Sequence, residues 1–248
     1  MFPVICHIGP LTIYSYGVMM AMAIFTCGYF LGKEAVSNGI RKEFVYDLIF
    51  WCVFGGIIGA RLFYIALNPG FFLENPLEVI MVQHGGLVWQ GGLIAGAISG
   101  IIFVKRKKWD VLRVLDIFAP YLALGQAIGR LGCFLNGCCY GKPFQWGIYF
   151  PVHEAWLHPT QLYLSGALFL IFFILKKFQK REHQIGDVFL VFLILDAVQR
   201  FFIEFFRDDH PGTSFYLSTF QWTSILIVIA SLAVHFYFKS CNQKKVHG

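Results

Sequence analysis

The sequence has little charge. Only 14% of its 248 residues are Asp, Glu, Lys or Arg, whereas 57% are hydrophobic. A soluble domain usually carries about 25% charged residues, and a chain of this length cannot bury so much apolar surface in water. The sequence also has no internal repeat and no low-complexity tract. The composition therefore argues against a soluble enzyme and predicts an integral membrane protein with a single polytopic domain over residues 1–248.

The N-terminus lacks the basic segment and the small-residue cleavage site of a signal peptide, so we expect the first apolar run to remain as a span. The sequence also lacks a charge pattern typical of nucleic-acid binding. Its net charge is +6, but most Lys and Arg residues follow apolar runs directly, as membrane topology requires. The expected partner at this level is the lipid bilayer, with no nucleic acid.

The seven cysteines do not form a secreted disulfide framework, and no C-x-x-C pair is present. Three of them, Cys133, Cys138 and Cys139, lie close together in the sequence. The nearest histidines, His153 and His158, are too distant in sequence to complete a typical metal motif. We therefore favour packing thiols over a disulfide, and a disulfide over a metal site, and predict no bound metal.

A helix needs about 20 apolar residues to cross a bilayer, and runs of this kind predict an all-α membrane fold with about seven transmembrane helices. The runs lie near Thr12–Leu31, Val45–Leu67, Gly86–Val104, Val111–Gly129, Thr160–Leu175, Ile185–Phe206 and Leu217–Phe238. Lys and Arg gather after the first, third and fifth runs and in the C-terminal tail, which predicts that these connections are cytoplasmic. We expect the N-terminus outside and the C-terminus in the cytoplasm.

Five basic residues do not follow this topology rule: Arg61, Arg130, Lys142, Arg200 and Arg207. An arginine at membrane depth costs roughly 2.5–3.5 kcal/mol, so it is normally paired or lines a polar cavity. These residues therefore mark the part of the chain where a function is expected.

Two of the arginines belong to a charged series in the sixth predicted span. Asp196, Arg200, Glu204 and Arg207 recur at helical spacing, which places them on one face. The series predicts either an ion-pair ladder that holds helices together or a site that accepts a further anion. For Glu204, the ladder is at least as well supported as a catalytic role.

The segment 125–141 is rich in glycine and contains Arg130 and Asn136. An arginine beside a glycine-rich turn is suited to hold a phosphate through its guanidinium and nearby backbone N–H groups. Close packing of helices through small residues is the alternative, and it explains the glycines but not Arg130.

A third segment, His84-Gly85-Gly86, stands at the outward start of the third predicted span. A histidine in this position can accept a proton near neutral pH. A role as an interfacial hydrogen-bonding residue is the alternative for His84.

These segments together resemble the prolipoprotein diacylglyceryl transferases, bacterial membrane enzymes that begin lipoprotein maturation. The resemblance covers almost the whole chain. Its motifs are Ile8-Gly9-Pro10, Tyr14-Ser15-Tyr16-Gly17, Gly59-Ala60-Arg61-Leu62-Phe63-Tyr64, His84-Gly85-Gly86, Leu115-Asp116 with Ala119-Pro120, Gly129 to Gly137, His158 to Tyr163, Arg200-Phe201, Glu204-Phe205, Arg207 and Gln221. Their order and spacing make the match specific.

The resemblance implies transfer of the diacylglyceryl group of phosphatidylglycerol to the cysteine thiol of a preprolipoprotein signal peptide. A thioether forms and glycerol phosphate leaves, without a cofactor, at a site toward the outer side of the bacterial cytoplasmic (inner) membrane. His84, Arg130 and Arg200 are then the expected catalytic residues, with His84 as the base or as a group that orients the headgroup. The expected substrate-binding residues are Tyr16, Arg61, Gly85, Gly86, Asn136, Gly141, Glu204 and Arg207.

Two positions depart from the family pattern. Cys133 stands where many members have Asn, and Asp196 stands where a Tyr is common. A carboxylate beside Arg200 would weaken anion binding unless another cation compensates. The alternative function is therefore a divergent paralogue that binds lipid or transports a small anion, although the sequence lacks the repeat seen in many transporters.

Overall fold

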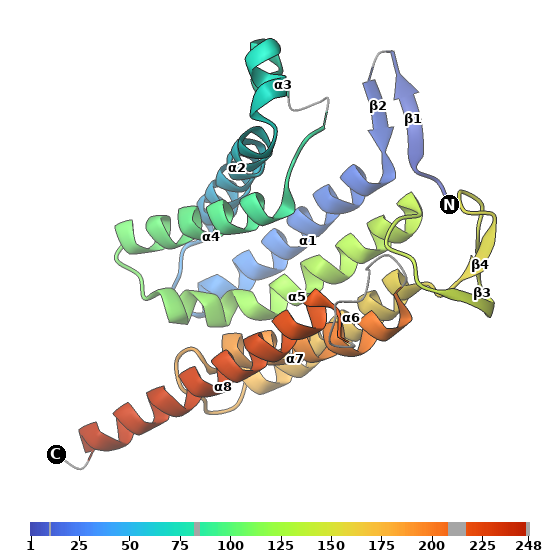
Figure 1. Ribbon diagram of the computed structural model, residues 1–248. Helices are drawn as coiled ribbons and strands as arrows, with labels where there is room; N and C mark the ends of the chain where they lie inside the picture. The colour runs from blue at the N-terminus through green and yellow to red at the C-terminus, as the bar shows by residue number, and fades with distance from the viewer. Residues whose placement is uncertain (10, 82–84, 208–216, 247–248) are drawn as a thin grey trace. The chain divides into compact units, whose positions relative to one another are not determined.

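The computed structural model describes residues 1–9, 11–81, 85–207 and 217–246, and most of them are helical. Figure 1 shows the helices and strands in order along the chain. The chain divides into two compact units. The first unit comprises Met1–Tyr29 and Leu115–Gly248, and the second comprises Phe30–Val114. The prediction of one polytopic domain stays a prediction.

The helices lie where the apolar runs predict them. They are α1 (Ser15–Ser37), α2 (Lys42–Leu67), α3 (Pro69–Glu74), α4 (Trp89–Arg106), α5 (Val111–Asn136), α6 (Thr160–Gln179), α7 (Asp187–Ile203) and α8 (Thr219–Val246), with 3-10 turns η1 (Pro76–Val79) and η3 (Glu204–Phe206). Among the described residues, 5 helices are long and apolar enough to cross a membrane: α1, α2, α5, α6 and α8. The protein is therefore a multi-pass membrane protein.

Helices α4 and α7 occupy the other two predicted spans but are shorter, with 18 and 17 residues. Apolar side chains on the long helices are strongly exposed, including Phe25 at 77% and Leu170 at 62%. Patches of this kind are rare on soluble monomers, and lipid contact accounts for them.

The purely helical prediction missed two short antiparallel hairpins. Strand β1 (Val4–Ile8) pairs with β2 (Leu11–Tyr14) before α1, and β3 (Pro143–Phe150) pairs with β4 (Ala155–Leu157) between α5 and α6. The second hairpin lies outside the long apolar runs, and β2 overlaps the beginning of the first run, Thr12–Leu31. Hydropathy over a span-length window does not detect strands of this length.

In the second unit, α2 and α4 lie side by side and approach each other through glycine. A Cβ at Gly59 would overlap the Cβ of Ala95 and lie 2.6 Å from the carbonyl oxygen of Gly91. A Cβ at Gly96 would lie 3.0 Å from the carbonyl oxygen of Cys52. Small residues let two backbones come together, so van der Waals contact holds this pair in the bilayer.

In the first unit, α5, α6 and α7 share an apolar core of which Ala123, Leu168 and Phe192 are examples. Asp116 of α5 also fixes the beginning of α7. Its Oδ2 accepts a hydrogen bond from the N–H of Gly186 at 2.6 Å, and its Oδ1 accepts one from Phe189 at 2.9 Å. A carboxylate at a helix N-terminus satisfies free N–H groups and offsets the helix dipole.

Candidate active site

The structure distributes the predicted site residues over both units. The first unit contains Tyr16, Arg130, Asn136, Gly141, Arg200, Glu204 and Arg207, and the second contains Arg61, Gly85 and Gly86. His84 lies outside the described residues. The two groups are therefore described separately.

Helix α5 ends in a Schellman motif. Gly137 has a positive φ of 77°, the N–H of Cys138 donates to the carbonyl of Cys133 at 3.2 Å, and the N–H of Gly137 donates to Phe134 at 3.1 Å. Glycine is favoured at this position because an L side chain is strained there. The turn ends the helix at Asn136 and directs the chain toward Gly141.

The next residues are tied to two other segments of the first unit. The N–H of Gly141 donates to the carbonyl of His158 at 2.9 Å, and the N–H of Lys142 donates to Phe206 at 2.8 Å. A Cβ at Gly141 would overlap the carbonyl oxygen of Phe206 and lie 2.7 Å from the Cγ2 of Thr160. We call these three segments (residues 137–142, 158–161 and 206–207) the loop junction. Gly141 acts there through close approach of backbones.

Arg130 lies one turn and a half before the end of α5 and is half-buried. Within the part of the chain that the structure describes, its guanidinium has no hydrogen bond or salt bridge. Its charge acts on Cys139 and on Asp196 of α7. A half-buried cation without a bonded partner among the described residues is the feature expected of a site that receives an anion.

Arg200 and Arg207 share the carboxylate of Glu204. Glu204 Oε2 lies 3.4 Å from Nη2 of Arg200 and 3.9 Å from Nε of Arg207, and the side chains of Glu204 and Arg207 are only 2% and 4% exposed. Oε1 of Glu204 accepts a hydrogen bond from Ser218 at 3.0 Å. We call Arg200, Glu204, Arg207 and Ser218 the arginine–glutamate cluster. It combines two cations with one buried anion.

The predicted ion-pair ladder is therefore present at Glu204. Oδ1 of Asp196 accepts a hydrogen bond from the side-chain amide of Gln199 at 2.9 Å. The positive charges of Arg130 and Arg200 also act on the carboxyl group of Asp196. Asp196 thus places a carboxyl group near the two arginines on which anion binding was expected to depend.

In the second unit, Arg61 is buried and uses its guanidinium to hold the chain before α4. Its nitrogen atoms donate to the backbone carbonyls of Glu78, Val79, Met81, Gly85 and Gly86. Gly85 and Gly86 have φ values of 87° and 73°, and a Cβ at Gly86 would lie 2.7 Å from Nη1 of Arg61. Arg61 and the two glycines therefore fix the segment that directly follows His84.

Tyr16 and Asn136 lie at the ends of their helices near the cysteines. Tyr16 is 42% exposed, and a Cβ at Gly132 would lie 3.3 Å from its ring. Asn136 is the last residue of α5, two residues before Cys138. Hydrogen bonds from Cys133 and Cys138, together with the charges of Arg207 and Arg130, lower the pKa of Cys139 below its ordinary value.

Sequence reasoning did not assign roles to the residues that support the site. Thr160 and Gln161 are fully buried at the beginning of α6, where Thr160 Oγ1 donates to the carbonyl of Cys139 at 2.7 Å and Gln161 Nε2 donates to Cys138 at 2.6 Å. Gln221 Oε1 accepts from the N–H of Ser218 at 2.9 Å. Polar residues placed directly before or inside apolar runs were the available signal for these positions.

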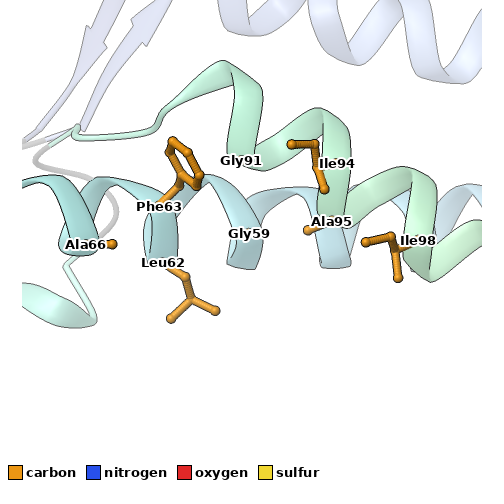
Figure 2. Close-up of a pocket in the computed structure, with 8 residues that line it drawn as sticks. All are labelled: Gly59, Leu62, Phe63, Ala66, Gly91, Ile94, Ala95 and Ile98. Carbon is orange, nitrogen blue, oxygen red and sulfur yellow. The ribbon is translucent and has the colours of Figure 1, made fainter.

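The second unit also has an apolar groove between α2 and α4, with a volume of about 280 Å³. Figure 2 shows the residues that line it: Gly59, Leu62, Phe63, Ala66, Gly91, Ile94, Ala95 and Ile98. Because the lining carries no polar side chain, the groove is suited to a hydrocarbon chain.

The fold and these charged groups define a multi-pass membrane protein with a polar, arginine-containing site. The family model for prolipoprotein diacylglyceryl transferase matches residues 3–237. The chain is 36% identical to the phosphatidylglycerol–prolipoprotein diacylglyceryl transferase of Clostridium tetani (strain Massachusetts / E88) over 241 residues, covering 94% of this chain and 96% of that protein. The chain belongs to the prolipoprotein diacylglyceryl transferase family.

Two relatives of the same name come from staphylococci. The protein of Staphylococcus carnosus (strain TM300) is 31% identical over 247 residues, covering 95% of this chain and 90% of that protein. The protein of Staphylococcus aureus (strain MSSA476) is 34% identical over 248 residues, covering 95% of this chain and 88% of that protein. Since all three similarities span nearly the full chains, they confirm the family that the sequence motifs indicated.

Proposed function

We propose that this protein transfers the diacylglyceryl group from phosphatidylglycerol to the lipobox cysteine thiol of a preprolipoprotein. The names of the relatives support this reaction over lipid binding without turnover or anion transport. The half-buried guanidinium of Arg130, without a salt bridge among the described residues, is the observation that carries the proposal.

The reaction exchanges one bond to carbon for another. The thiol loses its proton, its sulfur bonds to the glyceryl carbon, and the carbon–oxygen bond to phosphate breaks with its electron pair on oxygen. The leaving group is glycerol phosphate, so cations placed beside the developing charge lower the barrier. Arg130 fills this role directly, and Arg200 joins it.

The arginine–glutamate cluster positions Arg200. The buried carboxylate of Glu204 restrains two guanidinium groups and leaves the side chain of Arg200 20% exposed. Arg200 also lies over the ring of Phe220, with 4.9 Å between its Cζ and the ring centroid. A cation held in this way needs little reorganisation when a phosphate arrives, which is the source of electrostatic catalysis.

For the proton, we propose His84 as the acceptor. A thiol becomes a good nucleophile only as the thiolate, and histidine titrates in the physiological range. The clamp that Arg61 makes on the carbonyls of Gly85 and Gly86 supports this role, because it fixes the backbone next to His84. Arg61 is thus proposed as a positioning residue, and Tyr16 and Asn136 as hydrogen-bonding residues for the headgroup.

We further propose that the chain crosses the bacterial cytoplasmic membrane about seven times, with its site toward the outer side. The basic residues of alternate connections support an outer N-terminus and a cytoplasmic C-terminus. The groove between α2 and α4 is proposed to accommodate one acyl chain of the lipid substrate.

A transfer assay with purified protein tests the proposal. Phosphatidylglycerol and a lipobox peptide are supplied, and mass spectrometry measures the diacylglyceryl adduct on the peptide cysteine. Wild-type protein is expected to form the adduct, and Arg130→Ala is expected to lower the rate roughly 10²–10³-fold, as loss of a charge-stabilising donor does.

Arg113→Ala is the matched control, because Arg113 is an exposed arginine at the other end of the same helix. It should retain the wild-type rate. A folded wild-type protein that binds the lipid but forms no adduct would contradict the transferase function. A wild-type rate in Arg130→Ala would instead remove only Arg130 from the site.

A further inference from the structure

The sulfur atoms of Cys133, Cys138 and Cys139 converge on one point at the end of α5. All three lie within 4.8 Å of one another. The Schellman motif brings Cys133 and Cys138 together, because one of its two hydrogen bonds runs from the N–H of Cys138 to the carbonyl of Cys133, five residues earlier. Their convergence is thus a direct product of how the helix ends.

Cys139 joins the other two through an unfavourable backbone conformation. Its φ is 62°, in the left-handed region that costs an L residue about 1 kcal/mol. Two fully buried side chains hold this turn, since Thr160 donates to the carbonyl of Cys139 and Gln161 donates to the carbonyl of Cys138. The protein therefore fixes the backbone of two thiols with dedicated hydrogen bonds.

We propose that these cysteines form a binding site for a soft, thiophilic cation of the Zn²⁺ class. With metal–sulfur bonds of about 2.3 Å, three ligands of a tetrahedral ion stand roughly 3.8 Å apart, which the sulfur spacing accommodates with small side-chain rotations. A disulfide would use two sulfurs and leave the third unused, whereas a cation uses all three. Thiolates are the ligands that select such ions.

The surroundings suit the charge and coordination of this site. Three thiolates and one divalent cation carry a net charge of −1, and the guanidinium groups of Arg207 and Arg130 act on Cys139. No further His, Cys, Asp or Glu among the described residues joins the three sulfurs, so the fourth position is left to a water molecule. Oε1 of Gln161 is buried without a hydrogen-bond partner, and it supplies an acceptor beside this loop.

This site does not depend on the transfer reaction. The proposed cation site departs from the interpretation of the cysteines as packing thiols. That interpretation rested on the lack of a C-x-x-C pair and of a nearby histidine in the sequence, and the turn that ends α5 was not predicted. Binding of the ion releases the thiol protons to solvent, and no oxidant or reductant takes part.

The test uses the full chain in detergent, reduced with a phosphine and titrated with Cd²⁺ as a spectroscopic probe of thiolate coordination. Thiolate-to-cadmium absorption is expected to saturate at one ion per chain, and Zn²⁺ is expected to displace the probe. Cys139→Ser and the combined variant Cys133→Ser/Cys138→Ser/Cys139→Ser should lose this absorption.

Cys27→Ser/Cys52→Ser is the matched control, because these half-buried thiols lie in α1 and α2 outside the cluster, and it should titrate like wild type. Thermal unfolding of each variant without metal establishes that it is folded. Undiminished absorption in the triple serine variant would overturn the proposal. The absence of thiolate-to-cadmium absorption in the reduced wild-type protein would also overturn it. In that case, a disulfide in the protein as isolated would show that two of the cysteines form a redox pair.

Discussion

Helices α2 and α4 approach each other through glycine, whereas η3 and the beginning of α8 meet through charged and polar side chains. In the first case, a Cβ at Gly59 has no room beside Ala95. In the second, Glu204 joins Arg200, Arg207 and Ser218. A contact between small residues is stable only while the side-chain volume stays small, and a buried charge cluster is stable only while each charge is compensated by an opposite one. The two regions should therefore fail under different substitutions.

Removing the central carboxylate should have the largest effect on stability. Glu204→Ala leaves Arg200 and the buried Arg207 without their shared anion, and loss of one partner in a buried pair costs about 3–5 kcal/mol. Thermal unfolding in detergent measures the loss. Glu182→Ala, at an exposed position before α7, is the control and should unfold like wild type. Equal stability of the two variants would show that Glu204 does not compensate the arginines.

An added methyl group in the α2–α4 contact should have an intermediate effect. Gly59→Ala forces the helices apart, at a cost of roughly 1–3 kcal/mol for overpacking. Gly166→Ala is the matched control, because a Cβ at Gly166 of α6 meets nothing within 4 Å. The control should be neutral or slightly more stable, since alanine favours helix more than glycine. Unfolding curves that rank the two variants in the opposite order would contradict the close approach of α2 and α4.

Loss of the Ser218 hydroxyl from the arginine–glutamate cluster should have the smallest effect. Ser218→Ala keeps every charge but removes two hydrogen bonds, the donor to Glu204 at 3.0 Å and the acceptor of the Gln221 N–H at 3.2 Å, so we expect a destabilisation of about 1.5 kcal/mol. Thr223→Ala in α8 is the control, because Thr223 is exposed and donates to the carbonyl of Phe220, three residues earlier in its own helix. Chemical unfolding of both variants measures the difference. A loss in Ser218→Ala as large as that in Glu204→Ala would show that the charges contribute little.

The apolar runs predicted every long helix, because hydrophobic length is written directly in the sequence. The apolar runs could not predict which helix packs against α4 or how closely the two backbones approach, because the distance depends on the residue that faces each glycine. The hairpins β1–β2 and β3–β4 were missed because their strands are too short to be detected by hydropathy over a span-length window.

At the site, the sequence identified the arginines but not the partners that distinguish them. Arg61 and Arg130 look alike in the sequence, yet the first donates to five backbone carbonyls and the second has no bonded partner among the described residues. Every residue has a backbone carbonyl, so the sequence does not indicate which carbonyls accept a hydrogen bond from an arginine. The difference between Arg61 and Arg130 is therefore seen only in the structure. The cysteine cluster had a usable signal, because Asn136-Gly137 after an apolar run predicts a helix end that joins residues five apart.

The loop junction also constrains how the protein is made. Gly141 forms a backbone bridge with Arg207, and the residues between them include the whole of α6 and α7. A ribosome therefore delivers the two partners at different times, and α7 must be synthesised before the bridge can close. Until then, the N–H of Lys142 lacks its partner, the carbonyl of Phe206. The loop junction is thus completed late in biogenesis, when most of the chain has already been synthesised.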